Sequence, residues 1–65
     1  MSPKQFLIRR RLHMVRRDLI KALATETTVT EIITHYGFWD FGRFAGRFKA
    51  MFGELPSAVL ARPPE

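Results

Sequence analysis

The stretch from residue 28 to residue 53, TVTEIITHYGFWDFGRFAGRFKAMFG, decides the fold of this chain. Apolar side chains recur in it at steps of three and four, which is the spacing of one face of an α-helix. They form two groups: Val29, Ile32, Ile33 and Tyr36, then Phe41, Phe44, Phe48, Met51 and Phe52. An apolar face needs a surface to pack on, so we expect two short helices packed on each other and on a third element. Two short helices that cross over a glycine-containing turn form a helix-turn-helix.

Local signals define the ends of both helices. Thr28 and Glu31 have the spacing of a capping box, in which the Thr28 hydroxyl accepts from the Glu31 amide and the Glu31 carboxylate reaches back to the Thr28 amide. Asp40 is the expected N-cap of the second helix. Gly37 and Gly53 can take the left-handed backbone conformation that ends a helix. The predicted helices span residues 29–36 and 41–52.

A longer helix is predicted over residues 3–23. Ser2 can cap it, Pro3 suits its first position, and Gln5 can complete a capping box. Its buried stripe is predicted to consist of Ile8, Leu12, Val15, Leu19 and Leu23. The opposite face carries Arg9, Arg10, His13, Arg16, Arg17 and Lys21. At 1.5 Å per residue the rod is about 30 Å long, so it is expected to extend past the two short helices.

Shorter features complete the pattern. Phe38 is expected to pack between the two short helices, and Trp39 to be partly exposed beside the turn. Pro56 opens a short helix over residues 56–61, which would lay Val59 or Leu60 on the core, and residues 62–65 are expected to fray. With no internal repeat and no linker, the prediction is a single all-α domain over residues 1–65, with a long N-terminal helix packed on a helix-turn-helix.

Charge is the informative part of the composition. Eleven Lys and Arg against six Asp and Glu give the 65 residues a net charge of +5 and a pI near 10.8. Such a surplus favours a polyanionic partner, although a solvated cationic face that only maintains solubility is the alternative. There is no cysteine, so neither a disulfide framework nor a thiolate metal site is available. No apolar run approaches the roughly 18 residues of a membrane span, and no signal peptide is evident.

These residues resemble the AraC/XylS family of bacterial transcription regulators, whose DNA-binding region carries two helix-turn-helix units joined by a long linker helix. The family's final pattern is in register with Ile32, Gly37, Phe38, Asp40, Phe44, Phe48, Lys49, Phe52, Gly53, Pro56 and Ser57. Its linker-helix opening is similar to Ser2, Pro3, Phe6, Leu7, Arg11, Leu12 and Leu19. The resemblance implies a cytoplasmic, nucleoid-associated protein. It also implies that the first unit and any effector or dimerisation domain precede Met1, so that this chain is part of a longer regulator.

The chain departs from the family pattern at several positions. Ile33 stands where a small alanine is usual, which would hold the helices slightly further apart, and Val15 replaces a small residue of the linker helix. Gly42 and Gly46 stand where the family often has polar side chains that face the DNA groove. Val59-Leu60 replaces a Tyr-Arg pair, which removes one phosphate contact.

In helix-turn-helix proteins the second helix presents its early residues to base edges in the major groove, while flanking groups hold phosphates. The candidates for base contacts are therefore Phe41, Gly42, Arg43, Ala45 and Gly46. The candidates for phosphate contacts are Thr28, Thr30, Arg47 and Lys49.

Each of these roles has a simpler alternative. Arg43 could bond a guanine bidentately, which contributes about 1–3 kcal/mol of discrimination; a phosphate contact or plain solvation is the alternative. Arg47 could instead pack on the long helix, and Phe41 is more often a core residue at this spacing. Gly42 and Gly46 each cost about 1 kcal/mol relative to alanine in a helix. Either they let the backbone approach DNA closely, or nothing selects a side chain there.

Other classes of function fit the sequence less well. It has no Ser-His-Asp set, carboxylate pair or glycine-rich phosphate loop, so we expect neither an enzyme nor a cofactor. His13 and His35 lack partners at metal-ligand spacing. A membrane-active or calmodulin-binding helix would use residues 3–23 alone and leave the capped helices unexplained. The main alternative to double-stranded DNA binding is a protein-interaction fragment that keeps the architecture without useful DNA binding.

Overall fold

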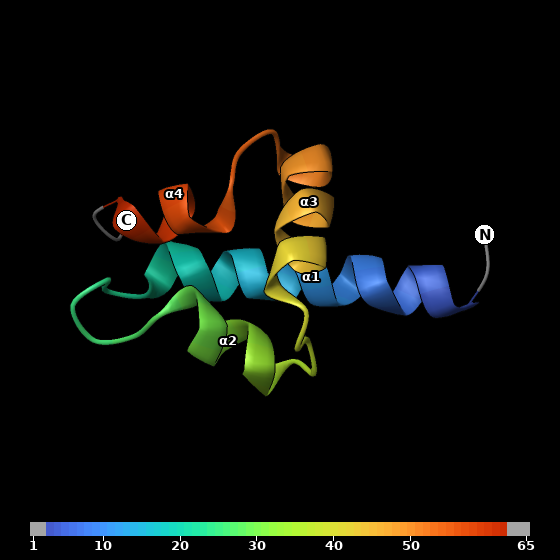
Figure 1. The fold of residues 1–65 in the computed structure, drawn as a ribbon, viewed down its shortest axis with the longest axis horizontal. Coiled ribbons are helices and arrows are strands. Elements are labelled where there is room, and N and C mark those ends of the chain that lie inside the picture. The colour runs from blue at the N-terminus through green and yellow to red at the C-terminus, as the bar shows by residue number, and fades with distance from the viewer. Residues whose placement is uncertain (1–2, 63–65) are drawn as a thin grey trace.

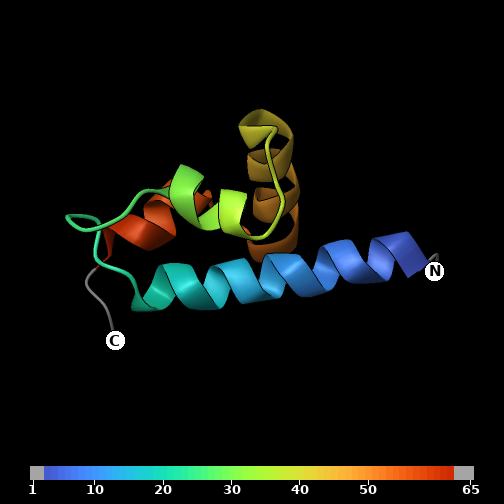
Figure 2. The same ribbon diagram turned by 90° about the horizontal axis from the view of Figure 1, so that it is seen from below.

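The structure is a computed structural model that describes residues 3–62. Within them the chain forms four helices and no strand: α1 (Pro3–Lys21), α2 (Val29–His35), α3 (Phe41–Phe52) and α4 (Pro56–Ala61). α1 is a long rod, and the three shorter helices gather on one side of it (Figures 1 and 2). The start of α1 extends past α3, as its length predicted, and gives the molecule extents of 36 × 21 × 19 Å. No helix in this part of the chain has the length and apolar character needed to cross a membrane.

All four helices contribute to one core. Its buried apolar side chains are Leu12, Val15, Leu19, Val29, Ile33, Phe44, Phe48, Val59 and Leu60. Val15 and Ile33, the two enlarged positions, are both fully buried, so the core accommodates the larger side chains. α4 buries both Val59 and Leu60, where only one of them was expected to reach the core.

The predicted end of α1 at residue 23 is wrong. The helix ends at Lys21, and the Leu23 carbonyl instead accepts from the amides of Glu26 (2.9 Å) and Thr27 (3.2 Å) in the following turn. Leu23 is 42% exposed and does not extend the buried stripe. The last two predicted helical residues are lost because the chain turns towards α2 at residues 24–26. The proposed Ser2 cap lies outside the described residues.

α2 ends one residue earlier than predicted, at His35, because a Schellman motif closes it. The Phe38 amide donates to the Ile33 carbonyl and the Gly37 amide to the Thr34 carbonyl, both at 3.0 Å. Gly37 has a φ of +87°, which an L side chain rarely adopts. The motif folds Phe38 back onto the core, where its ring centroid lies 4.9 Å from that of Phe44.

Arg62 is the last residue that the structure describes. Arg62, expected to begin a frayed tail, follows α4 and forms an ion pair with Glu54. The rest of the predicted tail, residues 63–65, lies outside the described residues.

Candidate nucleic-acid interface

The two caps place the helix-turn-helix. The Thr28 hydroxyl accepts from the Glu31 amide at 3.1 Å, and an Asp40 carboxylate oxygen accepts from the Arg43 amide at 3.1 Å, as the sequence predicted. The other half of the predicted capping box differs, because the Glu31 carboxylate accepts from the neighbouring Thr27 hydroxyl at 3.1 Å. Both caps satisfy amides that have no partner within the helix, so each helix begins at a fixed residue.

The outward face of α3 consists of small residues. Phe44 and Phe48 point into the core, and at 100° per residue the opposite side carries Gly42, Gly46 and Ala50, all exposed. A Cβ atom built on Gly46 meets nothing within 4 Å, and one on Gly42 meets only an Asp40 carboxylate oxygen at 3.8 Å. The backbone of α3 is therefore open to a partner along this face.

Cationic side chains stand on both flanks of this small-residue face. Lys49 is exposed on one flank, and Arg43 and Arg47 are exposed on the other. Ala45 is half-buried. Phe41 is 43% exposed, so it does not complete the buried stripe and remains available at the start of α3.

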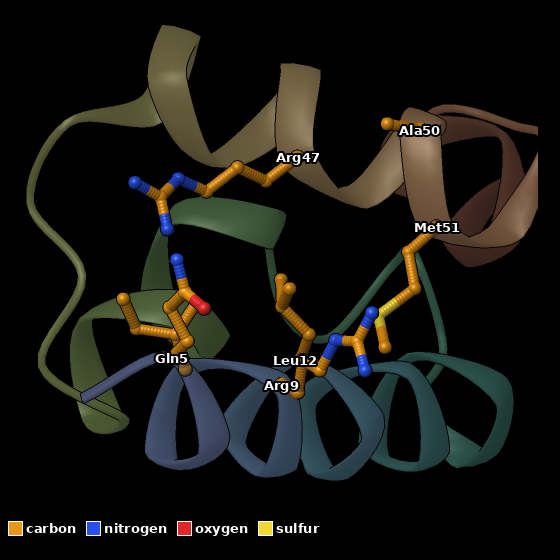
Figure 3. A pocket seen from close by; sticks show the side chains of 7 residues that line it. Gln5, Arg9, Leu12, Arg47, Ala50 and Met51 are labelled. Carbon is orange, nitrogen blue, oxygen red and sulfur yellow. The ribbon is translucent and has the colours of Figure 1, made fainter. Parts of the chain in front are cut away.

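Arg43 and Arg47 turn towards α1 and not straight outward. Both line a cleft between α1 and α3, which we call the Trp39 cleft, and Arg47 also lines a second cleft beside Met51. Figure 3 shows the side chains of Arg47 and Gln5 extending towards one another from the two helices. Arg47 thus lies on the side of α3 that faces the long helix.

Thr28 and Thr30 do not join the α3 candidates. They lie at the start of α2, whereas the turn into α3 follows its end about 10 Å away along the helix axis. The Thr28 hydroxyl is already occupied by the cap, and Thr30 is exposed.

Arg16 of α1 contacts the C-terminal end of α3. The Arg16 guanidinium lies 5.3 Å from the centre of the Phe52 ring, and the His13 ring meets the same phenylalanine edge-on at 5.2 Å. Arg16 is half-buried and its Nε is shielded from solvent without a partner. The sequence placed Arg16 on the face opposite the buried stripe, whereas in the structure it is half-buried against Phe52 at the C-terminal end of α3.

A second interhelical contact fixes α2 on α1. The Tyr36 hydroxyl donates to an Asp18 carboxylate oxygen at 2.5 Å. This hydrogen bond, with burial and the negative charge of Asp18, raises the pKa of Tyr36 above its ordinary value of 10.0, against an opposing effect of Arg17. No local pattern predicts this pair, because its members are 18 residues apart and meet only through the packing of the helices.

Trp39 is more exposed than the sequence suggested. It lies in the turn immediately before the Asp40 cap, and 92% of it is accessible to solvent. Among the residues that the structure describes, no group of His, Asp or Glu has the arrangement of a metal site. The features that stand out are therefore a capped, cation-flanked helix and an unburied tryptophan at its start.

Comparison with known proteins agrees with this geometry. Residues 1–62 match a protein family described as a helix-turn-helix domain. The XylDLEGF operon transcriptional activator 1 of Pseudomonas putida is 41% identical over 61 residues, which cover 94% of this chain and 18% of that protein. The XylDLEGF operon transcriptional activator 2 of the same organism is 37% identical over 60 residues, covering 92% of this chain and 38% of that protein.

A further relative comes from another organism. The probable thc operon regulatory protein of Rhodococcus erythropolis is 43% identical over 54 residues, covering 83% of this chain and 16% of that protein. No solved structure matches. The chain thus spans less than two fifths of the length of each of these relatives.

Fold, caps and relatives together define a helix-turn-helix domain of the kind found in transcription regulators. The chain belongs to that helix-turn-helix family, and it is of the AraC/XylS type, as its motifs indicated. The family consists of domains of DNA-binding regulators and is not an enzyme family.

Proposed function

We propose that this chain binds double-stranded DNA with α3 in the major groove, as part of a longer bacterial transcription regulator in the cytoplasm. The observation that carries the proposal is the outward face of α3, where Gly42 and Gly46 leave the helix backbone open between cationic flanks. A bare helix surface of this kind can lie close to base edges while Lys and Arg reach the phosphates.

The flanking cations have different roles in this proposal. Arg43, in the first turn of α3, bonds a base edge from one side of the small-residue face, with Phe41 and Ala45 next to thymine methyl groups. Lys49 on the other flank holds a phosphate, and Arg47 holds a phosphate from the edge that faces α1. Thr28 and Thr30 contact phosphate from the start of α2. Because few side chains reach base edges, affinity comes mostly from charge and DNA shape.

The proposal is tested by titrating a fluorescently labelled duplex with the chain at several salt concentrations and following anisotropy. Lys49→Ala should reduce the slope of log affinity against log salt by about one unit, because one phosphate contact is lost. Arg43→Ala should relax preference at one base pair by about 1–3 kcal/mol and alter the slope less. Arg10→Ala, on an exposed position away from α3, is the matched control.

Two outcomes would contradict the proposal. A folded chain that does not bind any duplex at low salt would retain the helix-turn-helix only as architecture and favour the protein-interaction alternative. Equal salt slopes for the Lys49→Ala and Arg10→Ala variants would show that binding does not use the flank of α3.

A further inference from the structure

The Trp39 cleft adjoins the outward face of α3 and shares Arg43 and Arg47 with the proposed DNA contacts. It has a volume of about 370 Å³ and lies between the start of α1, the turn after α2, and the flank of α3. Gly46 and Arg47 are consecutive in α3, so their side-chain directions differ by about 100°. Because Arg47 lines the cleft, the cleft opens to a different side of α3 from the face that carries Gly46. A partner seated in the cleft therefore approaches along α1 and not along the major-groove face.

The rim of this cleft is cationic. Lys4 and Arg11 stand on the α1 side, and Arg43 and Arg47 stand on the α3 side. Within residues 3–62 the ion pairs involve Arg17 and Arg62, and none involves these four cations. The acid at the rim, Asp40, already accepts a hydrogen bond from the Arg43 amide as the cap of α3. The cleft thus carries a surplus of positive charge that its own residues do not neutralise.

The floor of the cleft is apolar. Leu7, Ile8, Phe38 and Phe44 line it below the cations. Leu7 is 50% exposed, and the indole of Trp39 stands at the edge with almost no contact to the rest of the domain. The cleft thus combines apolar surface, an exposed tryptophan and cations without an ion-pair partner. Protein–protein interfaces have the same combination of an apolar anchor site and a charged rim.

We propose that the Trp39 cleft binds an acidic segment of a partner protein, with an aliphatic or aromatic side chain of that segment on Leu7 and Phe38. The carboxylates of the segment pair with Lys4, Arg11 and Arg47, and its anchor side chain covers one face of the Trp39 indole. A phosphodiester backbone would satisfy the cations but has no apolar group to fill the floor, so charge and shape together favour a polypeptide.

The test uses the full 65-residue chain and a short synthetic peptide in which Glu and Asp flank two Leu residues. Trp39 is the only tryptophan, so its fluorescence reports the cleft directly. Binding should shift its emission to shorter wavelength because the indole becomes buried. A peptide with Lys in place of the acids should not bind, and one with Ser in place of Leu should bind about tenfold more weakly.

Substitutions locate the site. Lys4→Glu and Leu7→Ser, both at exposed positions, should each weaken the acidic peptide by roughly fivefold to tenfold, since they remove a rim charge and the floor of the cleft. Arg10→Glu is the matched control, because it reverses an exposed charge on α1 that does not line the cleft, and it should leave affinity nearly unchanged.

Three results would overturn the inference. One is an unshifted Trp39 emission at millimolar peptide. Another is equal binding of the Leu and Ser peptides, which would reduce the effect to unspecific charge attraction. The third is a duplex DNA that shifts Trp39 emission in the parent chain but not in the Lys4→Glu variant, and that competes with the peptide. The cleft would then hold the DNA backbone and not a polypeptide.

Discussion

Asp40 controls where α3 begins, and with it the position of every candidate DNA contact on that helix. Its carboxylate accepts from the Arg43 amide, one of the amides without a partner inside the helix. Asp40→Ala should therefore lower the free energy of unfolding by about 1 kcal/mol, measured by urea denaturation. Asp40→Asn, which keeps an accepting oxygen at the cap, should lose much less. A similar loss in both variants would mean that the charge, and not the cap, stabilises the helix.

Tyr36 makes the stability of the domain depend on pH in the alkaline range. Its pKa in the folded state is raised above the value near 10 of an unfolded tyrosine, chiefly because its hydroxyl donates to Asp18. The stability from this contact is complete below pH 10 and is lost as the pH rises through the raised folded-state pKa, where tyrosinate can no longer donate.

Tyr36→Phe tests this dependence. The variant should be about 1 kcal/mol less stable at neutral pH, with the half-exposed position limiting the loss. Its stability should fall less steeply above pH 10 than that of the parent chain, when urea midpoints are measured across that range. Parallel pH profiles for the two proteins would show that the Tyr36 hydrogen bond does not contribute the alkaline component.

At the scale of single elements, α3 contains two glycines that its helical structure does not need. A Cβ on Gly46 meets open space, so Gly46→Ala should stabilise the domain by about 1 kcal/mol in thermal or urea unfolding. If the backbone approaches DNA here, the added methyl group should at the same time weaken duplex binding by about tenfold, or about 1.4 kcal/mol.

A stabilising change elsewhere serves as the control for Gly46→Ala. Thr34→Ala in α2, at an exposed position, should raise helix propensity without changing DNA affinity. Unchanged or tighter binding by Gly46→Ala would contradict the close approach and leave the glycine without a role in recognition.

Helix ends were predictable where a short-range signal sets them. Asp40 and Gly53 bound α3, and both act over three or four residues, so the sequence alone places the helix at 41–52. The end of α1 was missed because no glycine or proline marks it. Contacts between elements, such as Arg16 with Phe52 or Tyr36 with Asp18, depend on how the helices cross, which no local pattern encodes.

At the scale of the whole molecule, the sequence predicted the architecture better than the site. The apolar spacing indicated one core shared by all helices, and the structure has it. The sequence indicated the long helix as an alternative contact for Arg47, but not that Arg43 lies on the same flank, or that Trp39 stands almost free of the fold. The face of a helix follows from its core residues, but the exposed side chains take positions that the neighbouring helices determine.

The overhang of α1 divides that helix into two parts of unequal local stability. Its fully buried residues begin only at Leu12, and in the first two turns only Ile8 packs against the core, so these turns have fewer apolar contacts than the rest of the helix. Amides in those turns should open at much smaller free energy than those around Val15 and Leu19, which open only when the domain unfolds. A partner that binds to the part of α1 before Leu12 would make this part of the helix more rigid, so binding there and helical order are linked in one equilibrium.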